Sequence, residues 1–144
     1  MTLIRHIGVV IANIEQSLDF YVNTLGFKIS KKADESGQCI DNFLNLTDTE
    51  VTTIKMSDDN DNILELLYFS SHRDESDKNK ARALNEIGCS HFALTVNDLD
   101  DLHSNLIEKG IQFNYPPQVS DDGKVKVAFC RDPDGTFIEM VEEL

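Results

Sequence analysis

The sequence lacks any long apolar run. None of its hydrophobic stretches approaches the ~18 consecutive residues of a membrane-spanning helix. The first apolar segment, LIRHIGVVI at residues 3–11, reads as a strand, and no signal peptide precedes it. We therefore expect a cytoplasmic protein without a membrane partner.

Basic residues are also scarce. The chain has 13 Lys and Arg against 26 Asp and Glu, which gives a net charge of −13. Nucleic acids and anionic membranes are bound through basic patches. The charge balance therefore predicts that neither is a partner.

Cysteine is limited to three residues, Cys39, Cys89 and Cys130, and they form no CxxC pair. Their odd number excludes a fully paired disulfide framework and fits a reducing compartment such as the cytosol. We expect each cysteine to be a small core or boundary residue and not a nucleophile.

What the sequence does contain is an internal repeat. Residues 5–29 and 90–113 both begin with a histidine in an apolar run, His6 and His91. A small residue follows two positions later in each copy, and each copy then continues into a helix-like segment. Four polar or small positions matching in otherwise apolar strands indicate that the repeat is real.

The repeat predicts the same elements in each half. Apolar residues at three- and four-residue steps indicate a helix in each copy, and a glycine, Gly26 or Gly110, ends it. Strand candidates follow at 27–30, 42–46, 51–57 and 62–69 in the first half, and at 111–114, 118–120, 124–131 and 136–144 in the second. We predict an α+β fold of two βαβββ modules, with a His on the first strand and a Glu on the last.

Each last strand carries a carboxylate among apolar neighbours: Glu65 in NILELLYF and Glu139 in TFIEMVEEL. An unpaired charge is costly in such a position. If the halves pack about a pseudo-twofold axis, both carboxylates can meet His6 and His91 in one cleft. Two imidazoles and two carboxylates suit a divalent ion such as Zn, Ni, Co, Mn or Fe.

The two remaining histidines have no partner in the repeat. His72 lies in the polar stretch 70–84, and His103 follows an apolar position on the second predicted helix. We expect both to be exposed and to take no part in the site.

These motifs resemble the vicinal oxygen chelate superfamily, which includes glyoxalase I, methylmalonyl-CoA epimerase, extradiol dioxygenases and bleomycin resistance proteins. The resemblance rests on HIGVVIANIEQSLDFYVNTLGFKI, LELLYF, SHFALTV and VAFCRDPDGTFIEMVE. It implies a single domain over 1–144 whose two modules curl into an incomplete barrel around one divalent metal. Module 1 covers about 1–70, a linker with a short helix about 71–87, and module 2 about 88–144. The implied metal ligands are His6, Glu65, His91 and Glu139.

The ligand set is most similar to that of glyoxalase I. This likeness implies a lyase or isomerase that acts on a small carbonyl compound through a metal-stabilised enolate, with Glu65 or Glu139 as the base. Glyoxalase I enzymes that bind glutathione typically carry an Arg four residues after the first His and an Asn four after the first Glu. Val10 and Phe69 occupy those positions, which argues against glutathione.

Other members of the superfamily give alternative interpretations. The stretch between Glu65 and His91 is similar in length to that of methylmalonyl-CoA epimerases, although these often have a His where this chain has Ser90. A drug-binding protein without turnover is a third possibility, but such proteins generally lack a complete metal set. Extradiol dioxygenases need two His and one Glu and are usually about twice as long. A homodimer is expected, with the cleft formed within one chain or across two.

Overall fold

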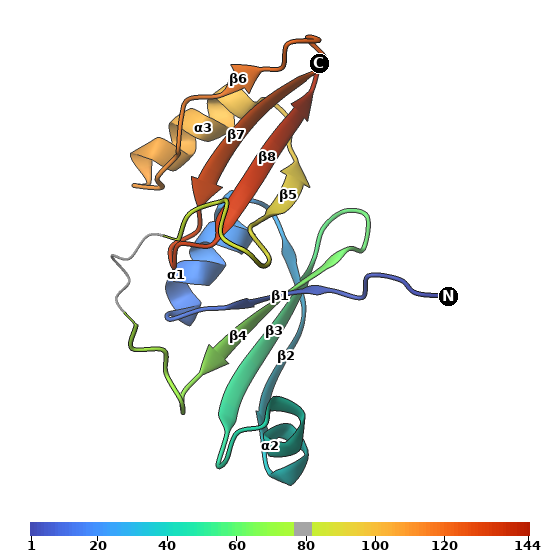
Figure 1. Cartoon of the computed structure of the whole chain (residues 1–144), viewed down its shortest axis with the longest axis vertical. Coiled ribbons are helices and arrows are strands. Elements are labelled where there is room, and N and C mark those ends of the chain that lie inside the picture. The colour runs from blue at the N-terminus through green and yellow to red at the C-terminus, as the bar shows by residue number, and fades with distance from the viewer. Residues whose placement is uncertain (77–81) are drawn as a thin grey trace. The chain divides into compact units, whose positions relative to one another are not determined.

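The computed structural model describes residues 1–76 and 82–144 and divides into two compact units, Met1–Ser76 and Asp77–Leu144 (Figure 1). Each unit contains one four-stranded mixed sheet. No helix in the described ranges is long and apolar enough to cross a membrane.

The first unit follows the order strand, helix, three strands, with one additional helix. Its elements are β1 (Ile7–Val10), α1 (Ile14–Leu18), the π-helical η1 (Asp19–Thr24), β2 (Lys28–Ser36), α2 (Gln38–Leu44), β3 (Glu50–Ser57) and β4 (Ile63–Phe69). The sheet order is β1-β4-β3-β2. β1 runs parallel to β4, whereas the other neighbours are antiparallel.

The helix of the first unit is anchored at both ends. The Asn13 side chain accepts a hydrogen bond from the Gln16 amide at 2.9 Å, which caps α1. The helix α1 continues directly into the wider π-helix η1, where the Leu25 amide donates to the Phe20 carbonyl five residues earlier. Gly26 then takes φ +86°, a conformation that favours glycine, and turns the chain into β2.

The two faces of the first sheet differ in burial. Along β4, Leu64 and Leu66 are buried, whereas Glu65 between them points to the opposite face. Ile54 and Met56 of β3 are completely buried on the same side as the two leucines. The face that carries Glu65 is therefore free to build a site.

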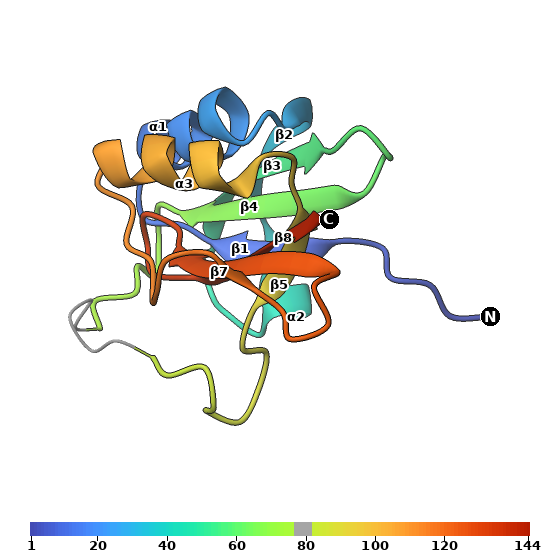
Figure 2. The same ribbon diagram turned by 90° about the horizontal axis from the view of Figure 1, so that it is seen from above.

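The second unit repeats this topology. Its elements are β5 (Phe92–Thr95), α3 (Leu99–Glu108), β6 (Gln118–Val119), β7 (Val125–Arg131) and β8 (Phe137–Glu143). The sheet order is β5-β8-β7-β6, and β5 runs parallel to β8. Figure 2 shows α3 lying along one face of this sheet, and α3 contacts β7 and β8.

The core of the second unit lies between α3 and its sheet. Leu99 and Leu106 on α3 and Ile138 and Met140 on β8 are completely buried. Asp98 caps the helix by accepting a hydrogen bond from the Asp101 amide at 3.2 Å. The predicted α+β class and the two βαβββ modules are thus confirmed.

Two predicted strands are wrong, and their loss leaves three strands after each helix. Residues 42–46 fall mostly within α2, whose C-terminus is capped by Asn45 at φ +53°. In 111–114 the structure has a single isolated bridge, from Phe113 to Cys130. Pro116 and Pro117 follow and lack the amide hydrogens that a longer ladder needs.

The linker also differs from its prediction. Residues 82–91 form turns and bends and not the expected short helix. Residues 77–81 of the predicted linker lie outside the described ranges. His72 is exposed as expected. His103 is only partly exposed, because its ring packs edge-on against Phe113 with centroids 4.5 Å apart.

The cysteines divide into two kinds. Cys130 is buried, as expected, and burial raises the pKa of its thiol to about 12. Cys39 and Cys89 are exposed, so the prediction of a core or boundary position is wrong for them. All three are free thiols.

Candidate metal centre

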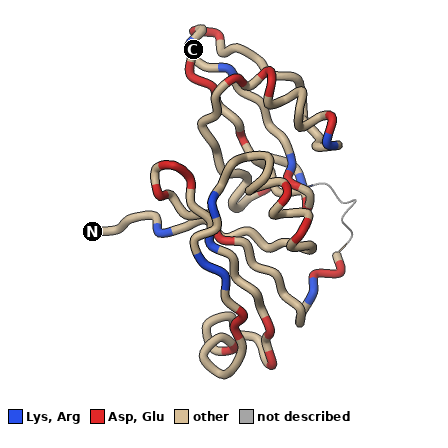
Figure 3. Tube along the Cα trace, turned by 180° about the vertical axis from the view of Figure 1, so that it is seen from behind, with Lys and Arg blue, Asp and Glu red and all other residues tan. Residues whose placement is uncertain are grey.

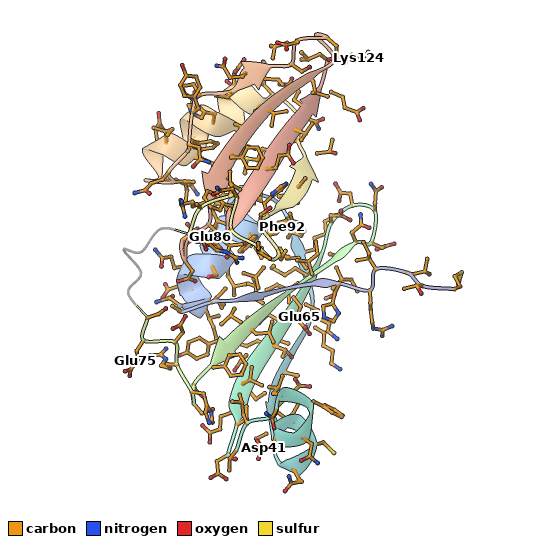
Figure 4. All side chains as sticks on the ribbon, viewed as in Figure 1. Asp41, Glu65, Glu75, Glu86, Phe92 and Lys124 are labelled. Atoms are coloured by element: carbon orange, nitrogen blue, oxygen red, sulfur yellow. The ribbon has the colours of Figure 1, made fainter. Side chains whose placement is uncertain are left out.

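The first unit brings His6 and Glu65 together. His6 lies one residue before β1, and Glu65 is at the centre of β4, the parallel neighbour of β1. The His6 Nε2 is 3.2 Å from the Glu65 Oε2. Glu65, labelled in Figure 4, is 12% exposed, so its carboxylate is largely withdrawn from solvent.

The second unit contains the same pair. His91 lies one residue before β5, and Glu139 is at the centre of β8, the parallel neighbour of β5. The His91 Nε2 is 3.2 Å from the Glu139 Oε2. Each histidine was predicted on a first strand and instead immediately precedes it.

The small residue of the repeat has a clear packing role. Gly8 is the register partner of Glu65, and Ala93 is the register partner of Glu139. A Cβ at Gly8 would come within 3.3 Å of the Leu67 Cδ1, closer than ordinary van der Waals contact. The Leu67 side chain therefore favours glycine at position 8, next to Glu65 across the two strands.

Sequence reasoning assigned no role to Ser90, yet the structure places it against a predicted ligand. The Ser90 Oγ is 2.7 Å from the His91 Nδ1. A metal bound at Nε2 would place the ring hydrogen on Nδ1, where the Ser90 Oγ could accept it. The ring is also packed edge-on against Phe129 at 5.1 Å between centroids. The position of Ser90 directly before a candidate ligand was the sequence feature that could have pointed to this role.

A second residue without a sequence-based role is Lys55 on β3. Its Nζ is 3.6 Å from the Glu65 Oε1, and the two residues are register partners across β3 and β4. In the second unit the partner of Glu139 is Phe129. The two His–Glu pairs are therefore equivalent, but their immediate surroundings are not.

The donor atoms fit a divalent metal. Two atoms that bind one such ion as neighbouring ligands at ~2.1 Å lie roughly 3 Å apart, and the nitrogen–oxygen separation in each pair is 3.2 Å. Each unit supplies one nitrogen and one oxygen donor. Within the described part of the chain, no group of three or more His, Cys, Asp or Glu side chains converges, so the four-ligand set stays a prediction.

Acidic residues outnumber basic residues over the whole chain. Figure 3 shows Asp and Glu positions spread over both units, with Lys and Arg among them. The carboxylates of Asp41 in α2 and of Asp58 and Asp122 in turns have a lowered pKa, because each accepts hydrogen bonds; Ser120, for example, donates to Asp122. These carboxylates are occupied by hydrogen bonds and are not candidates for the metal.

Known proteins share this duplicated arrangement of modules. The chain is 29% identical over 150 residues to a lactoylglutathione lyase of Pseudomonas putida, which covers 96% of this chain and 83% of that enzyme. A glyoxalase family protein from Bacillus cereus has a similar structure, with a TM-score of 0.88 at 19% identity over 100% of this chain and 95% of the other. Glyoxalase I from Leishmania major, described as trypanothione-dependent, matches with a TM-score of 0.61 at 22% identity, covering 99% and 88%.

The family follows from a match over nearly the whole chain. A model of one superfamily covers residues 3–140, which include all four candidate ligands. The resemblance found in the sequence is thereby confirmed. The chain belongs to the Glyoxalase/Bleomycin resistance protein/Dioxygenase superfamily.

Proposed function

We propose that this protein is a divalent-metal-dependent lyase or isomerase of the glyoxalase I-like type that acts on a small carbonyl compound. One observation carries the proposal: a His–Glu pair occurs in each module at the same place and with the same 3.2 Å separation. A duplicated pair of metal-binding residue types is expected of one shared centre and not of two unrelated surface contacts.

His6, Glu65, His91 and Glu139 would hold the metal, supplied by one chain or by two chains of a homodimer. When bound, a divalent ion would stabilise negative charge on the oxygen atoms of the substrate. It would also offset the cost of keeping two carboxylates away from water.

The carboxylates themselves would move the proton. A Glu side chain beside the substrate can take a proton from the carbon next to the carbonyl group and return it to a neighbouring atom. Glu139 is 26% exposed and Glu65 12% exposed. Both retain some access to a bound molecule.

The residues around the first pair argue against a glutathione adduct as substrate. Val10 on β1 and Phe69 on β4 occupy the positions where glutathione-binding relatives typically carry Arg and Asn. Neither side chain can form a hydrogen bond or an ion pair with a charged peptide end. The substrate that we propose is therefore smaller than that of a lactoylglutathione lyase.

Metal analysis is the first test. Purified protein should contain one divalent ion per site by inductively coupled plasma mass spectrometry, and His6→Ala and His91→Ala should each reduce that content. The His103→Ala variant provides a control, because this histidine packs on Phe113 and belongs to neither pair. Full occupancy in both ligand variants would contradict the proposed centre.

The second test is solvent deuterium exchange. The metal-loaded protein should catalyse exchange at the α-carbon of small carbonyl compounds, and Glu65→Gln or Glu139→Gln should slow it by 100-fold or more, as expected for the loss of general-base catalysis. Unchanged exchange in both variants would exclude a ligand carboxylate as the base. Metal binding without exchange in any carbonyl compound would favour a binding protein.

A further inference from the structure

Lys55 is a charged residue beside the first His–Glu pair, and the second module has Phe129 at the corresponding position. It lies on β3 with a side chain that is 34% exposed, and its ion pair with Glu65 spans 3.6 Å. Among the described residues, Glu65 is the acidic partner within salt-bridge distance of Lys55. A Lys ammonium group has three donors, so this contact leaves it able to bind another acceptor.

A second lysine lies next to Lys55 on the same face. Lys31 on β2 is the register partner of Lys55, so the row across the sheet is Glu65, Lys55 and Lys31. Like charges directly opposite one another disfavour strand pairing. The Lys55–Lys31 pair therefore does not improve the stability of the sheet, and the two lysines give this face positive charge beside Glu65.

The charge of the proposed centre is unbalanced by Lys55. A divalent ion contributes +2, the carboxylates of Glu65 and Glu139 contribute −2, and the neutral imidazoles contribute nothing. Lys55, the lysine in contact with Glu65, adds a positive charge that this set leaves unbalanced. A metal that binds Glu65 also weakens the hold of that carboxylate on Lys55, because both cations then share one anion.

The second module shows that the geometry of the His–Glu pair does not require such a lysine. At the corresponding position Phe129 is the partner of Glu139, and the His91–Glu139 separation is still 3.2 Å. The cation is thus an addition to one module. Its chemistry suits a bound anion better than the support of a ligand.

We propose that Lys55 binds an anionic group of the substrate, so that the substrate is a small carbonyl compound with a carboxylate next to its reacting centre. This inference rests on the proposed function, since it concerns the molecule that the metal centre would accept. One substrate carboxylate would balance the positive charge of Lys55. It would also occupy the Lys55 donors through a charge-assisted hydrogen bond.

The test compares an anion with its uncharged analogue. Pyruvate and methyl pyruvate have the same carbonyl group, and only pyruvate carries a carboxylate. Their dissociation constants are measured by calorimetry on the metal-loaded wild type and on Lys55→Gln and Lys55→Arg. We expect the wild type to prefer pyruvate by about 10- to 100-fold, the range expected of a hydrogen bond between charged groups. Lys55→Gln should abolish the preference, and Lys55→Arg should retain most of it.

Lys32→Gln is the matched control. Lys32 is the next residue on β2 and is the register partner of Ile54, so it projects from the opposite face of the sheet. The variant removes the same charge and should leave the preference for pyruvate unchanged. Loss of the preference in Lys32→Gln as well would attribute it to overall charge and overturn the role of Lys55.

A measurement of metal affinity distinguishes a Lys55 that binds the substrate anion from a Lys55 that only supports Glu65. Because Lys55 and the metal repel each other, Lys55→Gln should bind metal at least as tightly as the wild type. Metal binding weakened tenfold, with the pyruvate preference intact, would make Lys55 a support for Glu65 and overturn the inference. No measurable pyruvate binding to the metal-loaded wild type would also overturn it. A wild type without stoichiometric metal, found before any anion is added, would instead refute the proposed function.

Discussion

Replacing Ser90 by alanine tests whether the structure around His91 is built to hold a metal. In the wild type the Ser90 Oγ lies 2.7 Å from the His91 Nδ1, and the Nε2 of the same ring faces Glu139. In the metal-loaded protein the ring hydrogen would lie on Nδ1 and donate to the Ser90 hydroxyl, and without this acceptor the ring would be held less firmly for binding through Nε2. Ser90 is thus a positioning residue for His91.

The size of the effect can be bounded from this contact. The loss of one hydrogen bond costs about 0.5–1.5 kcal/mol, which corresponds to a change of roughly 2- to 12-fold. Residues that orient metal ligands typically contribute 10- to 100-fold in affinity. The ring keeps its edge-on contact with Phe129 in the variant, which limits its reorientation. We therefore expect Ser90→Ala to weaken metal binding by about tenfold.

The assay is a competition titration with a chromophoric chelator, accompanied by nitrogen-15 NMR of the imidazole rings. Metal affinity should fall in Ser90→Ala and recover in Ser90→Thr, which restores a hydroxyl. In the metal-loaded wild type the NMR spectrum should show the hydrogen of His91 on Nδ1, and its exchange with water should be slower than in the alanine variant. A purely structural role for Ser90 would not change this exchange rate.

The chain provides a matched control for this experiment. The Ser71 Oγ lies 3.0 Å from the His72 Nδ1, so the same chemical pair occurs at an exposed position that belongs to neither site. Ser71→Ala should leave metal affinity unchanged. Equal affinities of the wild type and Ser90→Ala, or an equal loss in Ser71→Ala, would refute the assignment of Ser90.

Three further predictions concern the scaffold. Ile54→Ala should lower the free energy of unfolding by about 2–5 kcal/mol in a urea titration, because Ile54 is completely buried; a loss below 0.5 kcal/mol would contradict the assigned core. Burial raises the pKa of the Cys130 thiol to about 12, so at pH 8 a thiol reagent should react with two cysteines in the folded protein and with three after unfolding. Fast reaction of all three cysteines in the folded protein would contradict the burial of Cys130. The hydroxyl of Ser120 lowers the pKa of Asp122, so this carboxylate stabilises the fold above pH 3.8 and the contribution is lost as the pH falls through the lowered value. Asp122→Asn should therefore flatten the acid limb of stability measured by thermal melts from pH 5 to pH 2, and an unchanged limb would refute this contribution.

The sequence was sufficient to single out the four residues of the two pairs, because their positions follow from the repeat, but it did not predict that each His contacts the Glu of its own module. Glu65 and Glu139 are conspicuous as charges between apolar neighbours, and alternation along a strand places them on the face opposite the core. His6 and His91 precede the parallel partners of those strands. Once two copies of a module are recognised, each residue of one copy specifies its counterpart in the other.

Other features depend on register and local competition, which the repeat does not encode. The contact of Lys55 with Glu65 requires the pairing of β3 with β4, and a shift of one residue would move Lys55 to the opposite face. Residues 42–46 have strand-like apolar spacing, but the helix from Gln38 to Leu44 includes the first three of them, and the Asn45 backbone ends it in a left-handed conformation. A short apolar stretch of this kind does not by itself distinguish a strand from a helix.

A comparison of the two modules also distinguishes the residues that would bind the metal from those that would select the substrate. The residues that the copies share, namely a His before the first strand, a Glu on the last and a small residue beside it, are those that a metal centre needs. The residues that differ lie directly against these ligands: Lys55 in one copy and Phe129 in the other. In the proposed centre the two ligand pairs would be equivalent, whereas Lys55 and Phe129 would give a small asymmetric substrate one charged and one apolar contact. We therefore expect substitutions at Lys55 and Phe129 to alter substrate preference far more than metal affinity, whereas substitutions at the shared positions should alter both.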